Sequence, residues 1–374
     1  MAAPSAALSI DGPALLSYLR AQVPGTPPPP ASIAVYKFTH GQSNPTYCIT
    51  VGSKRYVLRK KPPGKLLPSA HAVEREFQVM AALHGLVPVP EMLALCEDSS
   101  VIGTPFYVME YVQGRVFLDP SCPGLSPQER GMVFAQMQDA LAALHAVRPG
   151  EVGLGGFGKP EGFCLRNVKR WAAQYRASVD TPIPSMVQLE ALLLQRVPVE
   201  RDADPSVPRV VHGDFRLDNM VFHPAEPRLL AVLDWELSTL GDPIMDLAYC
   251  CLMYHLPPGL PGYASLVQPG GTLPPGTPTE SDLINGYCRA RGICPAPVFR
   301  HWAFYLALGT FRAASIAAGV ARRAELGNAS SAAAKDLGPM VALMSEIGLR
   351  ILAASPAAPR ALASGGGGGG GGGG

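Results

Sequence analysis

Three polar side chains, each beside a short apolar run, constrain the fold of this chain more than any other feature. Asp214 and Asn219 lie within residues 211–219, and Asp234 follows the apolar run 229–233. Because runs of this length rich in β-branched residues favour strands, the pattern predicts that the three side chains meet at neighbouring strand ends. Two carboxylates and an amide are suited to phosphoryl transfer, which needs a base for the attacking hydroxyl and oxygen ligands for the metal that bridges the nucleotide phosphates.

We therefore predict that Asp214 is the catalytic base, that Asn219 and Asp234 hold Mg²⁺, and that ATP is the donor. Taken singly, His-Gly-Asp at 212–214 is a turn and Asp234 a helix cap. The combined spacing, with Asp246 following Asp234 after twelve positions, favours a catalytic site. Asp246 is expected to brace the catalytic loop.

Longer motifs around these residues carry a family resemblance. Residues 212–214, 233–236 and 241–248 resemble the aminoglycoside phosphotransferase-like kinase family. Residues 41–64 resemble the kinase-like domain found upstream of the acyl-CoA dehydrogenase domain in family members ten and eleven. The resemblance implies an α+β, two-lobed protein-kinase-like fold, with a small antiparallel-sheet N-lobe and a larger, mainly helical C-lobe. It also implies a small-molecule hydroxyl acceptor, such as a 4-hydroxy acid or hydroxyacyl thioester, and an acyl-CoA dehydrogenase as a functional partner.

Composition shifts and this resemblance divide the chain into four parts. Residues 1–30 are expected to form an N-terminal extension that ends in a proline run, with the folded region starting after it. Residues 31–112 form the nucleotide-binding N-lobe, and residues 113–355 form the C-lobe with the catalytic and acceptor-binding residues. Residues 356–374, rich in glycine, form a disordered tail.

The N-lobe segments predict a small sheet and one helix. Clustered or alternating β-formers predict strands over 33–38, 47–51, 56–59 and 106–112, and apolar spacing predicts a helix over 72–83. In a kinase-like fold, Ser43 and Asn44 of the first turn would offer donors to the phosphates. Backbone groups near Glu110 and Val112 would meet the adenine edge.

One strand position departs from the family pattern. Arg59 stands where the family usually carries lysine, and the two cations are not equivalent in phosphate binding. Glu76 is expected to hold this cation against the phosphates, with Glu74 as the other candidate partner and a surface salt bridge as the alternative. Lys60 would point to the opposite face of the strand.

C-lobe patterns predict helices and acceptor contacts. A capping box at Ser126–Glu129 predicts a helix to about residue 147. Further helices are expected over 244–255, 280–291, 297–324 and 331–353, with a loop rich in proline and glycine over 256–279. The candidate acceptor contacts are Arg216, Glu236 and Arg312, the two arginines as clamps for a carboxylate.

The glycine-rich run 153–159 satisfies the dinucleotide-binding spacing and nearly that of a P-loop. Both motifs need a buried strand before and a helix after them, whereas here a helix precedes and Pro160 takes the place of the metal-binding hydroxyl. A flexible loop between helices is therefore expected.

Composition restricts the classes of partner. The net charge of +2 creates no strong field for nucleic acid, and no uninterrupted apolar run reaches the roughly 18 residues needed to span a membrane. A basic group at residues 55–65 is either a phosphate-facing edge, a nucleic-acid contact or a solvated turn. Eight scattered cysteines without a Cys-x-x-Cys pair indicate a reducing intracellular compartment. With no targeting pattern over 1–20, the cytoplasm is expected.

Two rival classes share these features. Arg59 in the lysine position favours a nucleotide-binding pseudokinase or scaffold, while the retained catalytic-loop polar residues oppose it. A protein kinase fits less well because Asp234-Trp235-Glu236 replaces Asp-Phe-Gly and the first turn is poor in glycine.

Overall fold

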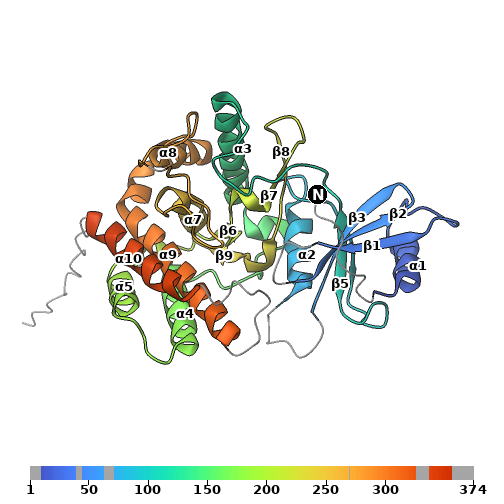
Figure 1. Ribbon diagram of the computed structural model, residues 1–374, viewed down its shortest axis with the longest axis horizontal. Helices are drawn as coiled ribbons and strands as arrows, with labels where there is room; N and C mark the ends of the chain where they lie inside the picture. The colour runs from blue at the N-terminus through green and yellow to red at the C-terminus, as the bar shows by residue number, and fades with distance from the viewer. Residues whose placement is uncertain (1–9, 39–43, 63–70, 269, 326–336, 356–374) are drawn as a thin grey trace, which may run out of the picture.

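The computed structural model describes residues 10–38, 44–62, 71–268, 270–325 and 337–355, which form two lobes (Figure 1). The N-lobe is built on an antiparallel five-stranded sheet in the order β1-β2-β3-β5-β4. Its elements are α1 (Gly12–Gln22), β1 (Ile33–Lys37), β2 (Thr46–Val51), β3 (Lys54–Lys60), α2 (Val73–Leu83), β4 (Met92–Cys96) and β5 (Phe106–Glu110). The predicted strands and helix are confirmed, and β4 is an additional strand.

Alternation along β3 decides which of its side chains enter the space between the lobes. Leu58 is buried in the apolar cluster that contains α1, whereas Val57 belongs to the core shared with α2. Because successive strand side chains point to opposite faces, Arg59 lies on the α2 side. Lys60 lies on the other side, where its Nζ is 3.5 Å from the carbonyl oxygen of Ile102. The sheet thereby directs one cation toward the C-lobe.

Helix α1 belongs to the fold of the N-lobe. The Asp11 side chain caps it by accepting the backbone N–H of Ala14 at 2.9 Å. Leu15 and Leu19 are fully buried against the strands. The prediction that the folded region starts after Pro30 is therefore wrong, because the helix supplies apolar cover for one face of the sheet.

The segment that crosses between the lobes is tightly seated on the C-lobe. The backbone N–H of Arg115 donates to the carbonyl of Phe222 at 2.8 Å, and the reverse bond is also 2.8 Å. A Cβ atom at Gly114 would lie 2.2 Å from the Phe222 carbonyl oxygen. Only glycine fits at this position, because any side chain would collide with the backbone of Phe222, which is fixed by its hydrogen bonds to Arg115.

The C-lobe is mainly helical, and α4, α5, α9 and α10 lie together in it (Figure 1). Its helices are α3 (Pro127–Ala146), α4 (Phe163–Ser178), α5 (Pro184–Gln195), α6 (Val199–Ala203), α7 (Ile244–Cys251), α8 (Glu280–Arg291), α9 (Pro295–Glu325) and α10 (Gly338–Ala354). Short 3-10 turns are η1 (Pro149–Val152), η2 (Leu217–Asn219), η3 (Trp235–Leu237) and η4 (Leu252–Tyr254). Two small antiparallel pairs are β6 (Arg209–Val211) with β9 (Thr239–Gly241), and β7 (Met220–Phe222) with β8 (Leu229–Val232).

Several C-lobe predictions are confirmed by these boundaries. The capping box of α3 is present, with the Ser126 side chain accepting the Glu129 N–H and the Glu129 carboxylate accepting the Ser126 N–H. Helix α8 has its predicted limits, and the helix predicted over 244–255 is α7 continued by η4. Helices α4, α5 and α6 were not predicted. Part of the helix predicted over 331–353 lies outside the described residues.

The glycine-rich run 153–159 connects η1 to α4 and is no nucleotide loop. Leu154 and Phe157 in it are buried in the core. Arg75 of α2 lies over the Phe157 ring at 4.0 Å and donates to its carbonyl oxygen at 2.6 Å. The run is therefore a packed connection that contacts the N-lobe.

Helix α9 is the central helix of the C-lobe. By length and composition it is the one described helix that would be able to cross a membrane, but 83% of its most apolar window is buried inside the fold. Trp302, Tyr305 and Phe311 are among its buried residues. This burial is typical of a core helix.

Candidate functional site

One buried carboxylate holds the loop that connects β6 to β7. Asp246, in the first turn of α7, accepts the backbone N–H groups of His212 at 2.6 Å and Gly213 at 2.8 Å. The His212 ring accepts the Asp214 N–H at Nδ1, and its Nε2 lies 2.9 Å from the Leu233 carbonyl oxygen. Since a carbonyl only accepts, Nε2 carries the proton and the ring is neutral. The loop is thus fixed to α7 and to the end of β8, so Asp246 has the bracing position that was expected.

Asp214 is held by Asn219 from the same loop. The Asn219 Nδ2 donates to the Asp214 carbonyl oxygen at 2.8 Å and to its Oδ2 at 3.0 Å. Burial acts to raise the pKa of Asp214, but the charges of Arg216 and Arg312 outweigh it, so the pKa lies below its ordinary value. Asp214 is therefore ionised at neutral pH and can accept a proton.

Asp234 follows β8 in a backbone conformation that is uncommon outside glycine. Its φ is 65° and its ψ is 62°, in the left-handed region that aspartate tolerates better than most residues. The neighbouring Leu233 N–H donates to the Asn219 carbonyl at 2.8 Å. The β7–β8 pair therefore brings Asn219 and Asp234 to adjacent positions, and both line the cleft between the lobes.

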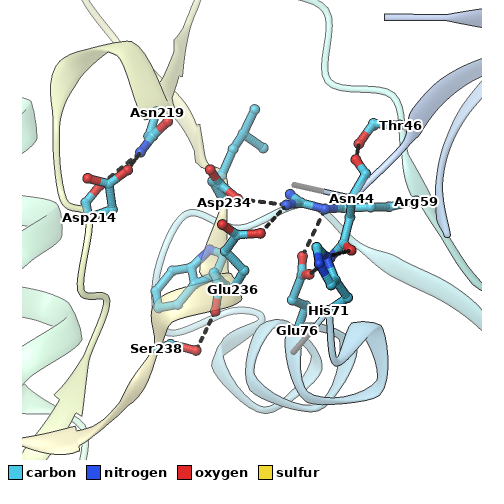
Figure 2. A network of polar contacts seen from close by, with 12 residues as sticks. Asn44, Thr46, Arg59, His71, Glu76, Asp214, Asn219, Asp234, Glu236 and Ser238 are labelled. Atoms are coloured by element: carbon cyan, nitrogen blue, oxygen red, sulfur yellow. Dashed lines mark hydrogen bonds and ion pairs between the residues drawn. The ribbon is translucent and has the colours of Figure 1, made fainter. Parts of the chain in front are cut away.

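Arg59 contacts three carboxylates, two of which lie across this cleft (Figure 2). Its Nη2 lies 2.9 Å from an oxygen of Asp234 and 2.9 Å from an oxygen of Glu236. Its Nε lies 3.3 Å from Glu76 Oε2, without the alignment of a hydrogen bond, and no other described atom accepts from it. Lys61 pairs with Glu74 at 2.8 Å, so Glu76 is the helical partner of Arg59.

Glu76 is only 1% exposed, and two neutral groups fix its carboxylate. The Asn44 amide donates to one oxygen at 2.8 Å and the Tyr107 hydroxyl to the other at 3.1 Å. His71 Nδ1 lies 2.9 Å from the Asn44 oxygen (Figure 2). The Asn44 amide therefore positions Glu76, while Asn44 also lines the cleft, and its contact with the phosphates stays a prediction. Ser43 lies outside the described residues.

The surroundings of Glu76 change its acidity. Burial raises the pKa of Glu76 to about 7 against the opposing charge of Arg59. The carboxylates of Asp234 and Glu236 add to the rise. The network therefore holds more negative charge than one guanidinium balances.

The cleft has a volume of about 510 Å³ and is lined by both lobes. Glu110 and Val112 lie along it at the crossing segment, where the adenine contacts were expected. In the described part of the chain, no three His, Cys, Asp or Glu side chains form a metal cluster. The donors of Asn219 and Asp234 fit Mg²⁺, which commonly takes one or two protein carboxylates and completes its shell with phosphates and water. The guanidinium of Arg59, which also lines the cleft, fits phosphate oxygens.

Two of the three candidate acceptor contacts already have partners within the protein. Arg216 is bound to both oxygens of Asp218 and to the Gly262 carbonyl at 3.0 Å. Glu236 faces Arg59 on the nucleotide side. The acceptor contacts predicted for Arg216 and Glu236 therefore stay predictions. Arg312, the third candidate acceptor contact, lines a second cavity together with Gly213.

Sequence reasoning missed further residues around the catalytic loop. Tyr249 of α7 lies 4.6 Å beneath the Arg312 guanidinium, and Tyr263 lies 5.7 Å from that of Arg216. Tyr263 belongs to the loop rich in proline and glycine, which therefore contributes to the site. Arg201 binds both oxygens of buried Asp242, at 2.7 and 2.8 Å. The sequence around these residues contains no motif that would have predicted their contacts.

Comparison with known proteins places this geometry in a family. The model of the phosphotransferase enzyme family matches residues 35–276. Acyl-CoA dehydrogenase family member 10 of Mus musculus is 46% identical over 312 residues, which are 83% of this chain and 28% of that protein. Family member 11 of Homo sapiens is 44% identical over 322 residues, which are 86% of this chain and 40% of that protein. The chain therefore spans less than half the length of these curated relatives.

Solved structures agree in fold. One from Ralstonia eutropha, assigned as an aminoglycoside phosphotransferase, has a TM-score of 0.80 at 41% identity, covering 93% of this chain and all of that one. Choline kinase from Cryptosporidium parvum has a TM-score of 0.66 at 12% identity, covering 92% of this chain and 96% of that one, and shows the fold alone. The predicted two-lobed, kinase-like α+β fold and the family resemblance are confirmed. The chain belongs to the phosphotransferase enzyme family.

Proposed function

We propose that this chain is an ATP-dependent kinase that phosphorylates a hydroxyl group of a small molecule. The observation that carries the proposal is the arrangement of Asp214, Asn219 and Asp234 beside a cleft that Arg59 spans. These four side chains are suited to in-line phosphoryl transfer, in which positioning of the reactants and stabilisation of charge supply most of the catalysis.

Each side chain has one task in this proposal. Asp214 accepts the proton of the acceptor hydroxyl, and its lowered pKa keeps it ionised for that step. Asn219 fixes the Asp214 carboxylate through its amide nitrogen. Asp234 and the Asn219 oxygen would hold Mg²⁺, which, when bound, neutralises charge on the ATP phosphates. Arg59, positioned by Glu76, would bind phosphate oxygens.

The acceptor class follows from the relatives. Their names are those of acyl-CoA dehydrogenases, whose substrates are acyl thioesters, and this supports a 4-hydroxy acid or hydroxyacyl thioester as the acceptor. An acyl-CoA dehydrogenase would then be the functional partner. All eight cysteines lie in the described part of the chain and are free, which supports a reducing intracellular compartment such as the cytoplasm.

One observation favours a second function, that of a nucleotide-binding pseudokinase or scaffold. Arg59 replaces the usual lysine and pairs with Asp234, a proposed metal ligand, at 2.9 Å. A protein whose Arg59 kept that contact would bind nucleotide without transferring phosphate. Magnesium-dependent turnover of ATP separates the two functions.

The test is incubation with labelled ATP and Mg²⁺, with and without a panel of acceptors. The panel contains hydroxy acids, their thioesters, choline-like alcohols and casein. Transfer of label to one of the small hydroxyl compounds supports the kinase. Nucleotide binding without any transfer supports the pseudokinase, and label on casein alone would show a protein kinase.

A further inference from the structure

A second cavity, of about 370 Å³, lies against the catalytic loop and is lined by residues of α4 and α9. Val211 and Gly213, which lead into Asp214, form part of its wall. It shares no lining residue with the nucleotide cleft. A ligand in it would therefore reach the catalytic loop without entering the space proposed for ATP.

Positive charge dominates the lining of this cavity. Arg166, Lys169 and Arg170 lie three and four residues apart on α4, a spacing that places them on one helix face, and Arg312 comes from α9. No carboxylate is among its described lining residues. The cavity is therefore short of negative charge.

Arg312 has the features of an incomplete anion site. It is 6% exposed, and its guanidinium lies 4.6 Å from the ring centre of Tyr249 and 5.5 Å from that of Trp171. Aromatic faces attract the charge but do not replace an oxygen acceptor. Its Nε has no hydrogen-bond partner in the described chain. Because a buried N–H without an acceptor is unfavourable, a bound oxygen would stabilise this group.

Arg166 repeats the pattern from a different helix. Its Nη2 donates to the Lys159 carbonyl at 2.5 Å, which fixes the guanidinium. Its Nη1 is buried and has no partner among the described atoms. Arg166 and Arg312 therefore line the same cavity, and the guanidinium group of each has one nitrogen without a hydrogen-bond partner among the described atoms.

We infer that this cavity, the cationic pocket formed by Arg166, Lys169, Arg170 and Arg312, binds an oxyanionic group of the acceptor. Guanidinium groups bind carboxylate and phosphate oxygens in a forked geometry, and exposed cations at the rim attract an anion. The inference rests on the proposed function. It restricts the acceptor to molecules that carry a carboxylate or a phosphate in addition to the reacting hydroxyl.

Four acceptors with the same reacting hydroxyl group show whether the pocket binds a carboxylate or a phosphate. The free 4-hydroxy acid carries a carboxylate, and its amide is the neutral counterpart. The phosphopantetheine thioester carries a phosphate, and the pantetheine thioester is its neutral counterpart. A preference for the charged member identifies the carboxylate in the first pair and the phosphate in the second.

The test variant is Lys169→Gln with Arg170→Gln, because both side chains are exposed and their loss does not open the core. Loss of two hydrogen-bonding cations is expected to raise the KM of the preferred charged acceptor about 10-fold. The KM of its neutral counterpart is expected to change less than about twofold, since it has no charge to lose. Equal shifts for charged and neutral acceptors, or no shift, would overturn the inference.

The matched control is Arg289→Gln with Arg300→Gln, two exposed helical arginines that do not line either cavity. It removes the same charge from the molecule and is expected to keep wild-type KM values. A shift equal to that of the test variant would show a nonspecific effect of net charge and would also contradict the cationic pocket.

A binding measurement separates this inference from the proposed function. Inorganic phosphate is titrated calorimetrically onto protein whose nucleotide cleft is filled with Mg²⁺ and AMP-PNP. Binding that is weakened about 10-fold in the test variant, and kept in the control, supports the cationic pocket even if no acceptor is phosphorylated. Wild-type protein that binds no phosphate, or a test variant that binds it equally well, overturns the inference.

Discussion

The two sides of the catalytic loop have opposite charge balances. On the nucleotide side, one guanidinium, that of Arg59, contacts three carboxylates. On the other side, the carboxylate of Asp214 is influenced by Arg216 and Arg312, and further cations line the cationic pocket. In the proposed function, a divalent cation with its phosphates would complete the first side, and the anion of the further inference would complete the second. Each side would then receive the charge that it lacks.

The same contrast appears in the acidity of two buried carboxylates. Burial acts to raise the pKa of both Glu76 and Asp214. At Glu76 burial prevails over the charge of Arg59 and, with Asp234 and Glu236 adding to the rise, brings the pKa to about 7, whereas at Asp214 the neighbouring guanidinium groups help to bring the pKa below its ordinary value. The balance between burial and local charge therefore differs between the two carboxylates.

The largest expected effect tests whether Asp214 supplies the base. Asp214→Asn keeps the size of the side chain but removes its ability to take the proton, so kcat should fall by about 10²- to 10⁴-fold. ATP affinity, measured by calorimetry, should change little, since Asp214 does not line the nucleotide cleft. Turnover equal to that of the wild type would remove the mechanism.

A smaller loss is expected on the nucleotide side from Asp234→Asn. Asparagine tolerates the left-handed backbone of this position, so the change isolates the carboxylate charge. The Mg²⁺ concentration for half-maximal turnover should rise by roughly 10²-fold. Kinetics measured across a Mg²⁺ series provide the test, and an unchanged Mg²⁺ requirement would place the metal elsewhere.

The raised pKa of Glu76 predicts a pH dependence of stability. The folded-state pKa of about 7 lies above the ordinary value of 4.5, so the folded protein binds more protons between these limits. Relative to Glu76→Gln, the free energy of unfolding of the wild type should therefore fall as the pH rises from 4.5 to 7, by up to about 3 kcal/mol. Urea denaturation at several pH values measures it. The control Glu74→Gln should show no such difference, and parallel curves for wild type and Glu76→Gln would contradict the assignment.

The smallest expected effect comes from Arg59→Lys. A single ammonium lacks the forked geometry that lets Arg59 meet Glu76, Asp234 and Glu236 together, so stability should fall by about 1 kcal/mol. Because the family resemblance implies that lysine can serve at this position, the KM for ATP should change by less than about 10-fold. Thermal unfolding and ATP kinetics check the two statements. A rise in the KM for ATP of much more than about 10-fold would show that phosphate binding depends on the forked guanidinium group.

Local sequence patterns predicted the strands of the N-lobe and those beside the catalytic loop well, because strand alternation and helix capping depend only on residues close together in the sequence. Alternation placed Arg59 and Lys60 on opposite faces, and a capping box marked the start of α3. Helix α4 was missed because Gly162 at its start has no side chain, and its first turn is capped from a distance by Asp202, which accepts the N–H groups of Cys164 and Leu165. The segment that forms α1 was expected to belong to an extension outside the fold, since its burial depends on contacts with distant strands.

The site was less predictable where a local bond redirects a side chain. Arg216 is bound by Asp218, two positions away, and the pattern of residue types does not show this. Glu236 turns toward Arg59 because Asp234 takes a left-handed conformation at the end of β8. The cationic pocket depends on the packing of α4 against α9, which sequence spacing within either helix does not reveal.

The close seating of Gly114 has a mechanical consequence for nucleotide entry. With two backbone bonds joining Arg115 to Phe222 and no room for a side chain at position 114, the chain is clamped to the C-lobe from that point onward. Any bending of the crossing segment between β5 and this clamp is then confined to residues 111–113. A bulkier residue at position 114 would force this segment away from β7 and widen the gap that Arg59 has to cross.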